Sequence, residues 1–144
     1  MIRFEKITEE NFDIAVQITV TEEQDMVIAP VVYSLAQCYI MPDILEPYLI
    51  LNENIPVGFI LFIIDRKEAQ YEICRFMIDK NHQKKGYGKT ALLKAIEYLK
   101  DRGASVIELS HQTNNYGVGK LYESVGFVYT GIIEDGEVMM KLEF

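Results

Sequence analysis

The sequence of 144 residues is poor in cysteine and has no long apolar run. Its two cysteines, Cys38 and Cys74, lie far apart and outside any CxxC pattern, and the start MIRFEKITEEN lacks the apolar run of a secretory signal. Both observations favour a reducing cytoplasm. The longest apolar stretch, VGFILFII at 57–64, is far shorter than the roughly 20 residues that cross a bilayer, so we expect a buried strand there and no membrane partner.

Basic residues are also scarce. The 14 lysines and arginines face 22 aspartates and glutamates, which gives a formal net charge of -8. This acidity argues against nucleic acid or an anionic membrane as a partner and favours a cationic small molecule. Repeats and Pro/Gly/Ser-rich linkers are absent as well, so we expect a single domain over residues 1–144, which is long enough to bury about two-thirds of its unfolded surface.

Apolar periodicity, caps and turn residues together predict an α/β fold with a mixed sheet. An Asp-Gly pair suits a two-residue hairpin because both positions can take a positive φ, so we expect the last two strands to be antiparallel. The expected strands cover 2–7, 48–51, 57–64, 71–79, 105–110 and the two segments around Asp135-Gly136; the expected helices begin at Thr8 and Thr21, cover 31–40 and 88–102, and begin again at Asn114 or Asn115.

The stretch NHQKKGYGKT at 81–90 connects a predicted strand to a predicted helix. The first N–H groups of a helix have no partner within it and carry the positive end of the helix dipole, which favours an anion. Gly86 and Gly88 let the backbone approach that anion, and Lys84, Lys85 and Lys89 add positive charge. We therefore expect a pyrophosphate site, although a solvated surface loop is an alternative. The spacing matches neither GxxxxGK[ST] nor GxGxxG.

Two segments in this order resemble the GNAT acetyltransferase superfamily. QKKGYG at 83–88 resembles its Q/R-x-x-G-x-G/A acyl-CoA signature, and Asn115 followed by LYESVGF at 121–127 resembles its N-x-x-A-x-x-L-Y-x-x-x-G-F segment, with Val118 in place of the usual alanine. The resemblance implies the GNAT acyl-CoA N-acyltransferase fold, a mixed and mostly antiparallel sheet flanked by helices.

Three further segments, YSLAQCY at 33–39, VGFILF at 57–62 and RFMID at 75–79, look like the bacterial spermine/spermidine (diamine) N-acetyltransferases. This resemblance implies an acetyl-CoA cosubstrate, no metal, transfer to a polyamine and a homodimer. The alternatives are another small amine, an amino acid, a protein N-terminus or an antibiotic as acceptor, and a noncatalytic acyl-CoA-binding sensor module.

The resemblance also implies positions for the cofactor. The main chain of Phe76, Met77 and Ile78 would run beside the pantetheine arm as an added strand, while their side chains belong to the core. Asn115 would contact the cofactor near its thioester and could equally cap the helix. The loop around the pyrophosphate would comprise Gln83, Lys84, Lys85, Gly86, Tyr87, Gly88 and Lys89.

By the same resemblance, Tyr122 stands close to the departing sulfur. A phenol with an ordinary pKa near 10 is protonated at neutral pH, so we expect Tyr122 to be the general acid; the alternative is a core tyrosine. Cys74 occupies the position of the acidic residue that serves as a base in related enzymes, and a cysteine without an activating partner is more often buried and inert. Glu72, on the same face two residues earlier, is our expected base, acting through a water.

Other candidates are less specific. His111 is a second candidate base because its ordinary pKa near 6.5 suits neutral pH, and His82 is expected to be a solvated loop residue. Carboxylates and aromatic rings attract ammonium groups, so we expect the amine pocket near the N-terminal helices. Its candidate residues are Glu22, Glu23, Asp25, Tyr33, Tyr39 and Glu46, although acids also favour a first helical turn and the tyrosines could belong to the core.

Overall fold

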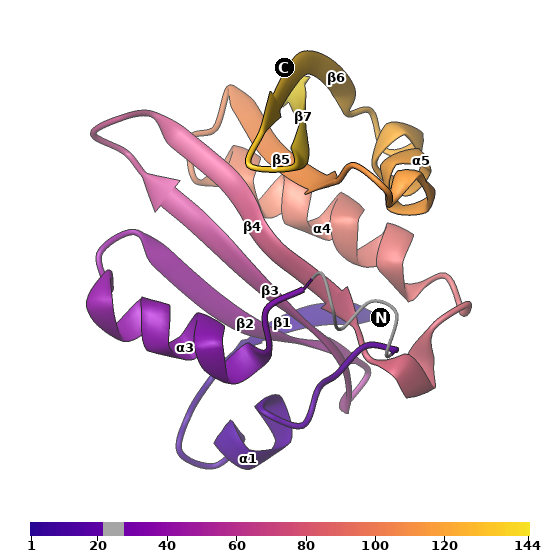
Figure 1. Cartoon of the computed structure of the whole chain (residues 1–144). Helices are drawn as coiled ribbons and strands as arrows, with labels where there is room; N and C mark the ends of the chain where they lie inside the picture. The colour runs from indigo at the N-terminus through magenta and orange to yellow at the C-terminus, as the bar shows by residue number, and fades with distance from the viewer. Residues whose placement is uncertain (22–27) are drawn as a thin grey trace.

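The computed structural model describes residues 1–21 and 28–144 and contains one sheet in the order β1-β2-β3-β4-β5-β7-β6 (Figure 1). All neighbouring strands are antiparallel except β4 and β5, so the prediction of a mixed, mostly antiparallel sheet is confirmed. The strands are β1 (Ile2–Lys6), β2 (Leu45–Asn52), β3 (Ile55–Asp65), β4 (Gln70–Ile78), β5 (Val106–Gln112), β6 (Val128–Glu134) and β7 (Glu137–Glu143).

Helices cover both faces of this sheet and enclose two apolar cores. On one face, α4 (Tyr87–Asp101) and α5 (Tyr116–Ser124) bury residues such as Leu92 and Tyr122. On the other, α1 (Phe12–Ala15) and α3 (Val31–Ile40) bury residues such as Val31. A 3₁₀ turn over Lys80–His82 precedes α4. Among the described residues, no helix is long and apolar enough to cross a membrane.

The helix limits agree with the sequence except near the N-terminus. The predicted start at Thr8 is wrong, because the amide N–H of Thr8 donates to Oδ1 of Asn11 at 2.7 Å and Asn11 donates back to the Lys6 carbonyl at 2.8 Å. These side-chain bonds hold a turn, and α1 begins only at Phe12. The helix predicted to begin at Thr21 would cover residues outside the described part of the chain.

Strand β4 contains a bulge at Cys74. Leu61 of β3 pairs with Arg75 and Phe62 pairs with Ile73, which leaves Cys74 as an extra residue on β4. A bulge turns the side chains beyond it to the opposite face. The apolar side chains of β4 before and after the bulge can therefore remain in the two cores although the strand bends.

Strands β4 and β5 diverge after one bridged pair, Glu72 with Glu108. They are parallel, and the chain between them passes through α4, as a crossover requires. Beyond this pair the sheet opens, with β4 on one side and β5 and α5 on the other (Figure 1). The opening is where the candidate site lies.

The last two strands form the predicted hairpin. Asp135 and Gly136 have φ values of 50° and 77°, so both central positions of the turn are left-handed. Pairing of β7 with β5 then places Glu137 opposite Gln112, next to the opening. The hairpin thus brings the C-terminal part of the chain to the site.

Candidate active site

Hydrogen bonds fix the loop that joins β4 to α4. The buried carboxylate of Asp79 accepts from the amides of Thr19 at 3.0 Å and Asn81 at 3.1 Å. Gln83 donates through Nε2 to the Ile78 carbonyl at 2.9 Å. The first part of the loop is therefore attached to the end of β4 and to the segment before residue 20.

The N-terminus of α4 is open to a ligand. Gly86 is the N-cap residue with φ of +82°, in the left-handed region that favours glycine, and Lys84 also has a positive φ of 62°. Within the described chain no side chain caps α4, and its first turn contains no acid. The positive end of the helix dipole thus has no anionic partner from this helix, which suits a bound phosphate.

A cavity of about 460 Å³ lies at this helix start, between β4 and α5. Tyr87 is held beside it by a hydrogen bond from Asn52 at 3.1 Å. His82, predicted to be a solvated loop residue, lines the same cavity. The predicted cofactor-binding residues in the lining are Phe76, Met77, Ile78, Gln83, Lys84, Gly86, Tyr87, Gly88, Lys89 and Asn115.

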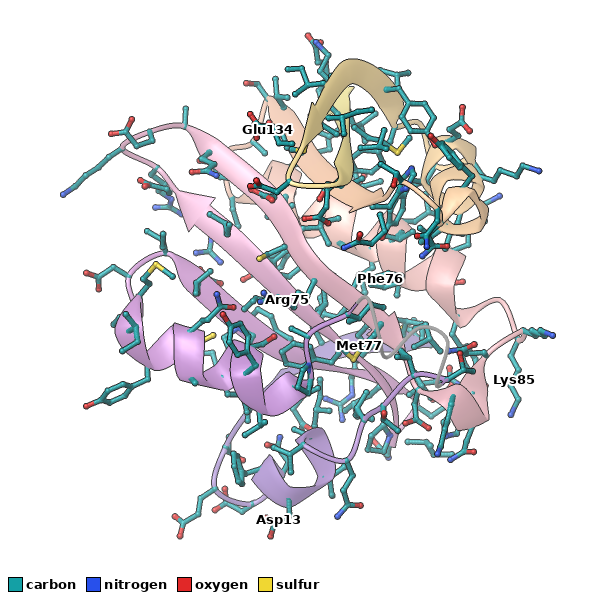
Figure 2. All side chains as sticks on the ribbon, in the orientation of Figure 1. Asp13, Arg75, Phe76, Met77, Lys85 and Glu134 are labelled. Carbon is teal, nitrogen blue, oxygen red and sulfur yellow. The ribbon has the colours of Figure 1, made fainter. Side chains whose placement is uncertain are left out.

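Two predicted cofactor residues lie outside this lining. Lys85 is exposed at the tip of the loop (Figure 2), where it adds positive charge without facing the cavity. Tyr122 lines a second cavity instead. At Gly88, an added Cβ would lie 3.6 Å from Leu121, which is an ordinary contact. The packing of the protein without a ligand therefore does not require glycine at this position.

The second cavity, of about 350 Å³, continues from the first into the opening between β4 and β5. The two cavities share Ile28, Phe76, Asn115 and Val118 in their linings. Asn115 thus lies where they meet. The second cavity has the more polar lining. Its titratable lining residues are Glu72, Cys74, Arg75, His111, Tyr122 and Glu137.

Tyr122 reaches the second cavity from α5 with its ring in the core. The side chain is only 6% exposed, and no described residue hydrogen-bonds its hydroxyl. Burial, and then the negative charge of Glu137, raises the pKa of the Tyr122 phenol above its usual value. Within the part of the chain that the structure describes, this protonated phenol is therefore available to a ligand.

Glu72 reaches the same cavity from β4. Burial raises the pKa of its carboxyl group, a hydrogen bond from Gln70 at 3.2 Å opposes this effect, and the charges of Glu108 and Glu137 add to it. A carboxylate with a raised pKa is a better proton acceptor near neutral pH than an ordinary glutamate. Burial likewise raises the pKa of the Cys74 thiol, which keeps the thiolate population low.

His111 is less suited to act as a base. Its Nδ1 lies 2.7 Å from the Gln112 carbonyl, which only accepts, so Nδ1 carries a hydrogen. Its Nε2 lies 3.0 Å from the Tyr129 hydroxyl. The ring is buried, and a Cβ at Gly119 would lie 2.8 Å from Nε2, so close packing holds the imidazole in place.

The three predicted amine-site residues that the structure describes do not line a common cavity. Tyr33 and Tyr39 project from α3 outside both cavities, where Tyr39 is 84% exposed and the Tyr33 ring lies 5.5 Å from the guanidinium carbon of Arg75. Glu46 lines a different cavity and pairs with Arg102. Helix orientation and long-range pairing thus place these three side chains apart from the two adjoining cavities. Glu22, Glu23 and Asp25 lie outside the described residues.

Sequence reasoning missed Glu137, which lines the second cavity. The residue follows the Asp135-Gly136 turn and looks like any exposed hairpin glutamate in the sequence. Only the pairing of β7 with β5 brings it to the opening. The turn signal directly before Glu137 was the one local indication of its position.

Comparison with known proteins identifies the family. The sequence profile of the acetyltransferase (GNAT) family matches residues 13–127, most of the chain. The chain belongs to the GNAT family. The predicted GNAT fold and N-acetyltransferase class are thereby confirmed.

Individual relatives of this GNAT chain are more distant. It is 32% identical over 106 residues to a probable spermine N(1)-acetyltransferase of Bacillus subtilis subsp. natto, covering 68% of the chain and 70% of the relative. It is 30% identical over 92 residues to an uncharacterized N-acetyltransferase of Methanocaldococcus jannaschii, covering 60% of the chain and only 40% of that relative. Its fold is similar to spermidine N-acetyltransferase from Vibrio cholerae in complex with CoA and spermine, with a TM-score of 0.79, 16% identity, and 99% and 95% of the two chains covered.

Proposed function

We propose that this GNAT protein transfers the acetyl group of acetyl-CoA directly to a primary amine of a polyamine. One observation carries the proposal: a cavity at the uncapped start of α4 continues, at Asn115, into a second cavity that is lined by two glutamates and by a tyrosine whose hydroxyl has no partner among the described residues. The first cavity suits the phosphates of the donor, and the second suits a cationic acceptor.

Residues of the first cavity would hold the cofactor. The N–H groups at the start of α4, together with Lys84 and Lys89, would bind the pyrophosphate, and the bent edge of β4 beyond the Cys74 bulge would bind the amide groups of the pantetheine arm. Acetyl-CoA supplies the acetyl group as a thioester.

The second cavity would handle the protons. In the transfer, a bond forms between the amine nitrogen and the acetyl carbon while the C–S bond breaks. Glu72 accepts a proton from the ammonium form of the acceptor, which frees the lone pair. As the bond forms, Tyr122 protonates the departing sulfur, and the second proton lost by the nitrogen passes through water to restore the Tyr122 phenol. Glu72 then gives up the first proton. One proton is thus released to solvent for each ammonium acetylated.

Two observations support a polyamine as the acceptor. Glu72 and Glu137 line the second cavity. The probable spermine N(1)-acetyltransferase of Bacillus subtilis subsp. natto is 32% identical to this chain. Cytoplasmic location and homodimeric assembly are further parts of the proposal, and light scattering of the purified protein tests the second.

The test is release of CoA thiol from acetyl-CoA by the purified protein with spermidine, spermine, putrescine, amino acids, aminoglycosides and N-terminal peptides. We expect release to depend on a polyamine. Productive transfer to another amine would keep the reaction and change the acceptor. Binding of acetyl-CoA without turnover of any amine would instead support the noncatalytic sensor module.

A further inference from the structure

Glu137, at the start of β7, lines the second cavity. It is half-buried and accepts a hydrogen bond from the Ser110 hydroxyl at 3.1 Å. Its charge contributes to raising the pKa of Glu72, Cys74 and Tyr122, which come from two different elements. Because its charge affects the pKa of all three groups, the Glu137 carboxylate lies close to them, and thus close to where an acceptor amine would react.

The carboxylates of the second cavity have no cationic partner in the described chain. Neither Glu72 nor Glu137 forms an ion pair with a described residue. Arg75 is the one arginine or lysine among the described lining residues, and it is already engaged. Its guanidinium donates to Ser34 and Gln37 of α3 and lies over the Tyr33 ring (Figure 2 shows Arg75 on β4).

An independent observation indicates that this cavity takes a ligand. The Tyr122 hydroxyl lines it on a side chain that is only 6% exposed, yet no described residue hydrogen-bonds it. No fully buried polar side-chain atom lacks a partner among the described residues, so this hydroxyl is accessible from the cavity. Hydroxyls on otherwise buried side chains are normally hydrogen-bonded, and a molecule that enters the cavity beside the carboxylates can provide the partner.

Glu72 and Glu137 cannot both act as the proton acceptor for one amine, so we expect them to have different roles. A reacting amine must be neutral, so the carboxylate that accepts its proton is itself neutralised. The second carboxylate then still lacks a counter-charge. A monoamine cannot supply one, whereas a diamine or longer polyamine has a further ammonium group.

We propose that Glu137 determines acceptor specificity by binding the second ammonium group of a diamine or polyamine, while Glu72 accepts the proton of the reacting amine. The inference rests on the proposed function and adds a division of labour within its acceptor site. Ser110 positions the Glu137 carboxylate through its hydrogen bond. Glu137 is thus a specificity-determining residue at the far end of the acceptor.

The test compares two acceptors of equal length on the wild type and on Glu137→Gln. The acceptors are 1,4-diaminobutane and n-pentylamine, which has a methyl group in place of the second ammonium. We expect the substitution to raise KM for the diamine about tenfold to a hundredfold with little change in kcat, because it removes one partner of a desolvated charge pair. KM for pentylamine, or its KI where turnover is too slow, is expected to change less than about twofold.

Glu134→Gln is the matched control. Glu134 pairs with Glu137 across the same hairpin, is exposed and lies outside the cavity linings, so its substitution removes the same charge from the same strands (Figure 2). We expect this variant to match the wild type with both amines. Thermal unfolding and acetyl-CoA binding of each variant show whether the fold and the first cavity are intact.

Two results would overturn the inference. An equal change for diamine and monoamine would mean that Glu137 acts through Glu72 or the fold, and no change for either would mean that it does not contact the acceptor. Calorimetric titration with spermine in the presence of CoA separates this failure from that of the proposed function. If no amine is acetylated, weaker spermine binding by Glu137→Gln still supports the inference, and equal or absent binding contradicts it.

Discussion

Two clusters of this protein combine glutamate and tyrosine, and only one of them has unused bonding capacity. In the first, Glu46 pairs with Arg102 at 2.7 Å and accepts hydrogen bonds from the hydroxyls of Tyr98 at 2.7 Å and Tyr48 at 2.9 Å. In the second, Glu72 has only a neutral partner, Gln70, within the described chain, and the Tyr122 hydroxyl has none.

The pKa shifts of the two glutamates have opposite signs because the two carboxyl groups have different partners. Burial acts to raise the pKa of both carboxyl groups. At Glu46 the hydrogen bonds from Arg102 and the two tyrosines outweigh burial and lower the pKa. At Glu72 burial prevails, and neighbouring carboxylates add to it. Removing one partner of a paired carboxylate leaves the other charge unpaired, whereas a carboxylate without a cation beside it is available for chemistry.

The largest expected difference concerns the tyrosines. Tyr122→Phe removes the proposed proton donor and is expected to lower kcat by about a hundredfold or more. Acetyl-CoA affinity, measured by calorimetry, should change little because the ring stays in the core. Tyr98→Phe removes hydrogen bonds of the Glu46 cluster and should leave thiol release unchanged. Equal turnover in both variants would remove the functional distinction between the clusters.

Substitution of the glutamates is the next test. Glu72→Gln is expected to lower kcat/KM about tenfold to a hundredfold through loss of the base. Because Glu72 must be deprotonated to act, wild-type kcat/KM should rise with pH through its raised pKa, and the variant should lose this limb of the profile. Glu46→Gln should keep both the rate and the profile. A variant of Glu72 with an unchanged profile would contradict its role.

Stability should respond in the opposite way. Glu46→Gln breaks a partly buried ion pair and is expected to cost about 1–2 kcal/mol in the free energy of unfolding. Glu72→Gln should cost nothing or stabilise slightly, because it removes a charge that burial disfavours. Urea unfolding at pH 7 measures both. A larger loss at Glu72 than at Glu46 would reverse the comparison.

The smallest expected effect is the pH dependence of these stability differences. The lowered pKa of Glu46 means that its contribution is present above its unfolded pKa, near 4.5, and is lost as the pH falls through the folded value. The raised pKa of Glu72 gives the opposite slope, since its contribution is present below pH 4.5 and is lost as the pH rises through the folded value. Unfolding of each variant beside the wild type across this range measures the slopes, and slopes of the same sign would contradict the assignment.

Local signals in the sequence were enough for much of the fold and for the first cavity. The loop at 81–90 contributes several adjacent residues to one helix start, and the Asp135-Gly136 turn has the predicted geometry. Both features are formed by residues that are adjacent in the sequence, so a local sequence pattern is enough to predict them.

The acceptor side depends on contacts between distant segments. Glu46 was assigned to the amine pocket, but its partner Arg102 lies 56 residues away. Glu137 reaches the cavity only through the pairing of β7 with β5. Tyr39 of α3 is directed to solvent, and α3 itself is hydrogen-bonded to Arg75 of the distant strand β4. Such contacts follow from packing and strand register, which no local pattern encodes.

The early divergence of β4 and β5 has a consequence for amide hydrogen exchange. After Glu72 and Glu108 the two strands share no further bridged pair in the described structure, so β4 amides that point away from β3 face the opening. Amides without a stable acceptor exchange quickly with solvent. An extended pantetheine arm would supply acceptors, and deuterium uptake along 74–78 would then fall on binding while the β3-facing amides of the same strand stay slow. The strand thus contains its own internal reference for occupancy of the cleft.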